Sequence, residues 1–137
     1  MIKLAGAKTF TMRRDDQILG LRSEIKTIDF EMSVSKAEQF QNKVLRPIIK
    51  FQHDLIVSVF DSVIKRKKID LESLSSDRKV RTITTIMKND RSLVNELRGL
   101  IVGLFTVEEY QEYTMIKSEI NRRIIQIIRE RLLSLVQ

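Results

Sequence analysis

The sequence predicts an all-α protein, built as a bundle of about four main helices, and three observations carry this prediction. The 137 residues include only four Gly and one Pro, which is too few for the tight turns of a β-sandwich. Apolar residues recur at helical spacing along most of the chain after residue 34. Pairs of residues with helix-capping spacing precede these apolar stretches. A chain of this length buries enough surface to fold without disulfides or metals.

The sequence divides into a partly ordered N-terminal arm, residues 1–34, and a helical bundle domain, residues 35–137. The arm shows no sustained periodicity, although Ile18, Leu19 and Leu21 are compatible with a short helix. We therefore assign the folding core to the second segment.

The first long helix is predicted to begin at Ser35, because Ser35 and Glu38 have the spacing of a capping box. Two neighbouring apolar rows then run through residues 40–64. Pro47 removes one helical hydrogen bond, and its ring clashes with the carbonyl four residues earlier. The helix must therefore kink near Arg46 or split in two. We favour the kink, since both rows keep their phase across the proline.

Two shorter helices are predicted to follow. The first begins at a cap formed by Ser75 or Ser76 and continues to about Lys88. Asp90 ends this helix and caps the next one, over residues 91–105.

The last predicted helix is the longest. Thr106 and Glu109 repeat the capping-box spacing and open a helix over residues 107–137. Its 31 positions would extend for about 46 Å at 1.5 Å per residue. Such a rod outreaches the other predicted helices.

The end of this helix is apolar on more than one face. Eight of the thirteen residues in 124–136 are apolar, which is more than one buried stripe requires. A second copy of the chain is the simplest cover, through a two-fold interface. We therefore expect a homodimer to which Ile125, Ile128, Leu132 and Val136 contribute.

The composition argues against an enzyme. Cys is absent, which excludes thiolate nucleophiles, iron–sulfur clusters and Cys-based zinc sites. The only histidine, His53, has no residue predicted to orient it for catalysis or metal binding. No phosphate-binding loop, dinucleotide-binding motif or nucleophile elbow occurs. We expect no catalytic residue, no metal and no cofactor.

The net charge of +7 raises the question of nucleic-acid binding. Residues 35–70 carry eight basic and four acidic groups, so +4 of the excess lies there, mostly in the run 65–68 at a predicted helix end. Residues 78–103 have a helix-turn-helix pattern, but the turn lacks Gly and the second helix is mostly apolar. Specific nucleic-acid binding is therefore the least favoured function.

No stretch approaches the roughly 18 apolar residues that cross a bilayer, and the N-terminus lacks the apolar region of a secretory signal. We expect a cytoplasmic protein that does not bind membranes.

Two functions of different class remain. The first is a structural or interaction protein, homodimeric, with a protein partner as a further option. The second is a protein that binds an anionic small molecule, or acts on one, through polar residues near the Pro47 kink and the start of the last helix. Guanidinium groups bind carboxylates and phosphates in bidentate geometry. The residues of this predicted cluster are Arg46, Lys50, Glu109, Tyr113, Arg122, Gln41 and Asn121.

Four stretches carry a family resemblance from about residue 12 onward: FQNKVLRPIIKFQ at 40–52, LRG at 97–99, FTVEEY at 105–110 and NRRI at 121–124. The chain resembles a family of short, all-helical, uncharacterised bacterial proteins that often carry the label glyoxalase. That label implies repeated βαβββ units with His and Glu metal ligands, or a His-rich motif. A chain with one histidine and helical periodicity fits neither of these two patterns. We therefore do not expect glyoxalase activity.

Overall fold

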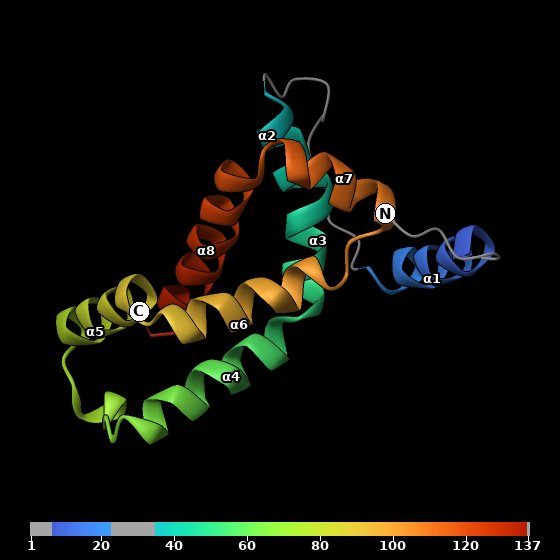
Figure 1. Ribbon diagram of the computed structural model, residues 1–137. Helices are drawn as coiled ribbons and strands as arrows, with labels where there is room; N and C mark the ends of the chain where they lie inside the picture. Colours follow the sequence, from blue (N-terminus) through green and yellow to red (C-terminus); the bar gives the residue numbers. More distant parts are fainter. Residues whose placement is uncertain (1–6, 23–34, 137) are drawn as a thin grey trace.

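The computed structural model describes residues 7–22 and 35–136, and every regular element in those ranges is helical (Figure 1). This confirms the all-α class. In chain order the elements are α1 (Ala7–Leu21), α2 (Lys36–Phe40), the π-helical turn η2 (Gln41–Leu45), α3 (Arg46–Phe51), α4 (His53–Arg66), the 3₁₀ turn η3 (Leu71–Ser73), α5 (Ser76–Asn89), α6 (Arg91–Val102), α7 (Val107–Met115) and α8 (Lys117–Ser134). The division is finer than four main helices, because both predicted long helices are interrupted.

The core lies where the segment η2–α3 meets α6 and α8. Ile48, Leu97 and Ile124 are fully buried there, each from a different helix. Full burial of such a side chain stabilises the fold by about 1.5–3 kcal/mol. Phe105 closes one end, with its ring in edge contact with the rings of Phe40, at 5.4 Å between centroids, and Tyr113, at 5.5 Å.

The first predicted helix does not kink at Pro47. The turn before the proline widens into η2, where the Arg46 N–H donates to the carbonyl of Gln41, five residues earlier. A wider turn accommodates a ring that would clash with the carbonyl four residues back. The chain changes direction later, at Gln52, whose backbone leaves the helical region at φ −85° and ψ 4°. There α3 ends, and α4 runs off at an angle (Figure 1). The Gln52 side chain donates to the Leu100 carbonyl of α6 at 3.0 Å, which fixes the bend.

The last predicted helix is not a single rod either. Ile116 adopts φ −133° and ψ 37°, which ends α7 and starts α8 in a new direction (Figure 1). The Tyr113 hydroxyl donates to the Asn121 amide oxygen across this bend. The 18 residues of α8 correspond to about 27 Å rather than 46 Å. A rod too long for its own domain is therefore absent, because the bend folds α7 and α8 onto one core.

The predicted helix caps form, but at Ser35 and Glu38 only one of the two capping-box bonds is present. The hydroxyls of Ser35 and Ser75 accept from the backbone N–H groups three residues later, and Asp90 does the same for α6 at 3.0 Å. Thr106 and Glu109 form both bonds of a capping box, at 2.8 and 3.1 Å. Local side chains thus set where these helices begin.

In the described part of the N-terminal arm, residues 7–22, helix α1 is fastened to the α6–α7 connection. The Arg14 guanidinium donates to the carbonyls of Gly103 and Phe105, at 2.9 and 3.0 Å. Arg22 donates to the carboxylate of Glu109, at 2.6 Å for one of the two bonds, and to the Leu104 carbonyl at 3.1 Å. Two arginines therefore bind the backbone carbonyls of the α6–α7 connection.

Among the described helices, none combines the length and the apolar character that a bilayer crossing requires.

Candidate functional site

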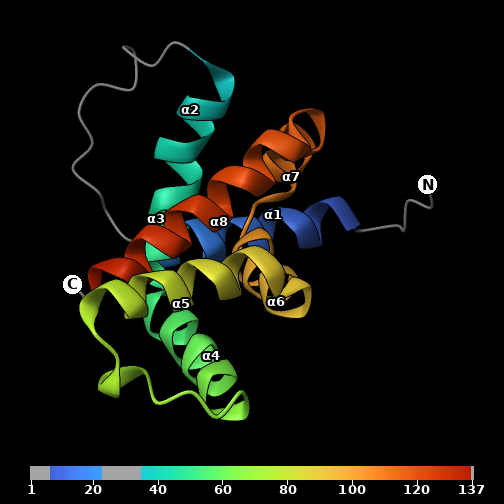
Figure 2. The same cartoon turned by 90° about the vertical axis from the view of Figure 1, so that its left-hand side faces the viewer.

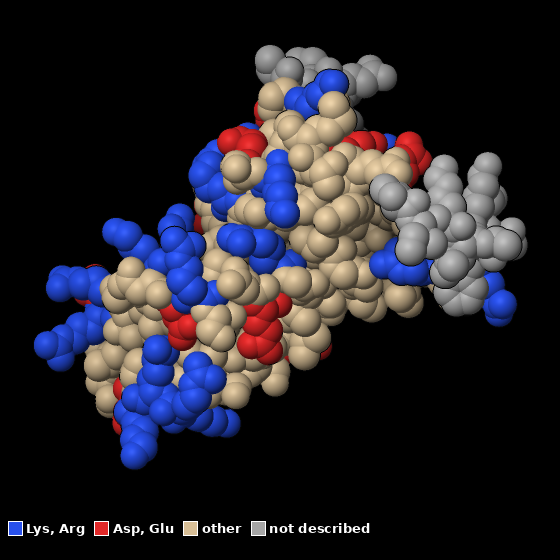
Figure 3. Space-filling model, in the orientation of Figure 1, with Lys and Arg blue, Asp and Glu red and all other residues tan. Residues whose placement is uncertain are grey.

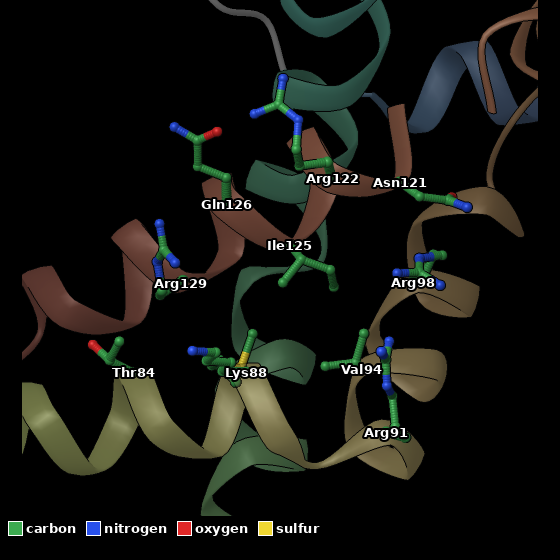
Figure 4. A pocket seen from close by; sticks show the side chains of 11 residues that line it. Thr84, Lys88, Arg91, Val94, Arg98, Asn121, Arg122, Ile125, Gln126 and Arg129 are labelled. Atoms are coloured by element: carbon green, nitrogen blue, oxygen red, sulfur yellow. The ribbon is translucent and has the colours of Figure 1, made fainter. Parts of the chain in front are cut away.

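Helices α5, α6 and α8 pack on one another and leave a pocket of about 430 Å³ between them (Figure 4). This volume falls within the range of small-molecule sites. The floor consists of Met87, Val94 and Ile125, one residue from each helix. Met87 and Val94 are buried, and Ile125 is half-buried. Figure 2 shows α5 and α8 side by side above α4, so the pocket lies at the junction of well-packed helices.

Five cations surround this apolar floor, and no acidic side chain lines the pocket among the described residues. In Figure 4, Arg91 and Arg98 of α6 stand on one side of Ile125, and Lys88 of α5 and Arg129 of α8 stand on the other. The fifth cation is Arg122, whose guanidinium points away from the floor. We call these eight residues, together with Thr84, Asn121 and Gln126, the basic pocket.

Most of this charge lacks an ionic partner. Arg122 pairs with Glu119 at 2.9 Å, and hydrogen bonds from Arg123 and Arg122 lower the pKa of that carboxyl, so the pair stays ionised. Within residues 7–22 and 35–136, no ion pair involves Lys88, Arg91, Arg98 or Arg129. Figure 3 shows Lys and Arg gathered over α5 and α8 on this face. The pocket therefore presents a positive field to solvent.

Arg98 is the most unusual member of the basic pocket. Its Nε is buried, and no acceptor in the described part of the chain bonds to it. The neighbouring Asn121 amide oxygen accepts from the Tyr113 hydroxyl instead. Leaving a buried donor unsatisfied costs about 1–3 kcal/mol. The fold carries this cost at a position that faces a pocket (Figure 4).

The predicted polar cluster does not form one site. Only Asn121 and Arg122 line the basic pocket. Tyr113 is buried and reaches the pocket only through Asn121, while Glu109 is bound by Arg22. The bend at Gln52 and the break at Ile116 separate the helices that one kink was expected to bring together.

The other members of the predicted cluster face elsewhere. Gln41 accepts from Arg123 at 2.9 Å, and Arg46 bonds to Asn42 on its own helix at 3.3 Å. Lys50 is exposed on α3. Gln41 and Arg46 therefore make contacts between and within helical segments, and Lys50 lies on the solvent-exposed face of α3.

The residues predicted for a dimer interface contact the chain's own core. Ile128 is fully buried and Leu132 is 3% exposed within one chain. Ile125 and Val136 are partly buried against the same core. Helices α5 and α6 and the turn η2 pack on α8 and bury Ile128 and Leu132 within one chain, while Ile125 stays half-buried and Leu135 is exposed.

His53 begins α4 and lies with Nδ1 3.2 Å from the Arg131 guanidinium. The Arg131 guanidinium has only donors, so a hydrogen bond in this contact runs from Arg131 to the imidazole. No group of three or more potential metal ligands occurs among the described residues.

Four cations of the basic pocket were not predicted: Lys88, Arg91, Arg98 and Arg129. They come from two regions of near-neutral net charge, so no local excess of basic residues marks them in the sequence. One signal was present, because Arg122, Gln126 and Arg129 share the i, i+4, i+7 face of a helix.

No protein-family model, no curated protein and no solved structure matches this chain.

Proposed function

We propose that this protein binds an organic anion in the basic pocket. The observation that carries the proposal is Arg98, whose Nε is buried without an acceptor at the edge of a pocket with no carboxylate lining it among the described residues. Three further cations there have no ion pair in the described chain. An anion supplies the acceptors and the countercharge that the fold itself leaves out.

The apolar floor favours an organic anion over a bare inorganic one. A ligand with a small hydrocarbon part covers the exposed portion of Ile125, and each buried methylene contributes about 0.8 kcal/mol. Thr84, Asn121 and Gln126 add hydrogen-bonding groups at the edge. Nothing in the pocket points to a reaction, so binding is the whole of the proposed function.

Calorimetric titration with organic phosphates and carboxylates tests this proposal. The unmodified protein is expected to bind at least one of them with a dissociation constant in the micromolar range. Arg98→Gln is expected to weaken that binding at least about tenfold, or about 1.4 kcal/mol. Arg13→Gln removes the same charge from the exposed face of α1 and is expected to change nothing. No heat and no thermal shift with any anion would refute the proposal.

A second candidate is the homodimeric interaction protein. The observation that favours it is the exposure of large apolar side chains on α3 and α4, where Phe51 and Leu55 remain 43% and 46% exposed. Exposed apolar side chains on both sides of the Gln52 bend suit a partner helix or a second copy.

Light scattering tests the dimer. We expect a dimer mass for the unmodified chain and a folded monomer for Leu55→Gln. The α8 residues Ile128 and Leu132 do not serve this test, since a charge there would disrupt the core. A monomer mass for the unmodified chain would contradict this second candidate.

A further inference from the structure

The cations of the basic pocket are divided between two sides of its floor. Arg91 and Arg98 project from α6 on one side, and Lys88 and Arg129 project from α5 and α8 on the other (Figure 4). The apolar side chains of Val94 and Ile125 lie between them. A single small anionic group that neutralises one pair therefore leaves the opposite pair uncompensated.

The number of charges on each side constrains the ligand further. Two cations face a ligand group from either side, and a carboxylate brings only one negative charge. A phosphate ester carries about −1.5 to −2 at neutral pH, with three acceptor oxygens. Each side also offers a guanidinium, which binds such oxygens in a fork. One phosphate per side therefore matches both the charge and the donors.

We infer that the ligand of the basic pocket is a small organic bisphosphate, with its two phosphate groups separated by an apolar body. This inference rests on the proposed function. One phosphate binds Arg91 and Arg98, and the other binds Lys88 and Arg129. The body covers Ile125. Because the Nε of Arg98 has almost no accessible surface, binding would turn this side chain toward the first phosphate, where the Nε gains an acceptor.

A single-stranded nucleic acid also presents phosphates on either side of a less polar group. Proteins that bind such strands stack the bases on aromatic side chains. None of the described residues lining the basic pocket is aromatic. The lining thus favours a small bisphosphate over a strand.

Three probes distinguish these ligands by calorimetry: the bisphosphate ester of a linear six-carbon diol, the monophosphate of the matching alcohol, and inorganic phosphate. The bisphosphate is expected to bind at least about tenfold more tightly than the monophosphate, a difference of about 1.4 kcal/mol. Arg98→Gln and Arg129→Gln each remove one of the two cations on one side and are expected to lower the bisphosphate's affinity toward that of the monophosphate. Circular dichroism checks that both variants fold, and Arg13→Gln serves as the control.

The possible results distinguish a ligand with two phosphates from anion binding in general. If monophosphate and bisphosphate bind equally, the two-sided ligand is wrong while anion binding stands. If no probe binds, anion binding itself fails. If a single-stranded oligonucleotide binds more tightly than the bisphosphate, with affinity that falls steeply with salt, the ligand is a polymer and the inference is overturned.

Discussion

At the scale of single residues, two arginines each bury a nitrogen that has no acceptor among the described residues, but the two side chains have different roles. Arg22 and Arg98 each bury an Nε that no described residue accepts from. The end of Arg22 is nevertheless fully engaged by Glu109 and the Leu104 carbonyl, so its role is structural. Arg98 has no such compensation and lines a pocket. A residue that destabilises the fold at a concave site is typical of binding function.

Arg98→Met is therefore expected to stabilise the protein in the absence of ligand. The change removes a buried unsatisfied donor and one of several like charges, so the free energy of unfolding should rise by about 1 kcal/mol. Chemical denaturation measures this. The matched control is Arg123→Met on α8, which loses bonds to Glu119 and Gln41 and should be less stable than the unmodified protein. A loss of stability in Arg98→Met comparable to that control would show that Arg98 has a structural role.

Glu109 predicts a pH dependence of stability. Burial raises the pKa of this carboxyl, but hydrogen bonds from Arg22 and from the Thr106 N–H outweigh burial and hold its pKa below the ordinary value of 4.5. A carboxyl with a depressed folded pKa stabilises the protein above its unfolded pKa, and this contribution is lost as the pH falls through the folded pKa. Stability should therefore decline below about pH 4.5.

Glu109→Gln tests the assignment. The variant should lose about 1–3 kcal/mol of unfolding free energy at pH 7, because a charged, largely buried acceptor of Arg22 is replaced by a neutral one. Its remaining stability should fall less between pH 5 and pH 3 than that of the unmodified protein. Equal acid sensitivity in both proteins would refute the role of Glu109.

At the scale of elements, the start of a helix could be predicted from the sequence wherever a local side chain caps the backbone. The caps at Ser35 and Asp90 and the box at Thr106 form as predicted. The breaks at Gln52 and Ile116 carry no such signal, since neither residue is Gly or Pro and both bends depend on packing against other helices. Pro47 predicted a kink, but the π-helical turn η2 accommodates the proline ring without one.

The end of α4 offers a local prediction. Lys68 has φ 57°, a left-handed conformation that favours glycine. Its N–H donates to the Lys65 carbonyl, and the Ile69 N–H donates to the Ile64 carbonyl, which is the Schellman pattern. Lys68→Gly should raise the free energy of unfolding by about 1 kcal/mol in denaturation experiments. Lys65→Gly, inside the helix, should lower it by a similar amount. A lower stability for Lys68→Gly would contradict this interpretation of the helix end.

At the scale of the whole molecule, the basic pocket arises from segments that are far apart in the sequence. Lys88 and Arg98 come from one region and Arg129 from another, and neither region is strongly basic. The run at 65–68, which is the most basic stretch, ends α4 instead. The sequence predicted Asn121 and Arg122 as ligand-binding residues, but it paired them with helices that bends hold apart. The site depends on how three helices converge, which periodicity does not encode.

The most direct test of anion binding is a nitrogen–proton NMR titration that observes the arginine Nε–H groups. The bisphosphate ester used above is added in steps to the unmodified protein. We expect the Arg98 Nε–H resonance to shift saturably, because the bound anion supplies its missing acceptor, while the equally buried Arg22 Nε–H stays in place. An Arg98 resonance that does not move, or that moves no more than that of Arg22, would contradict the proposed function.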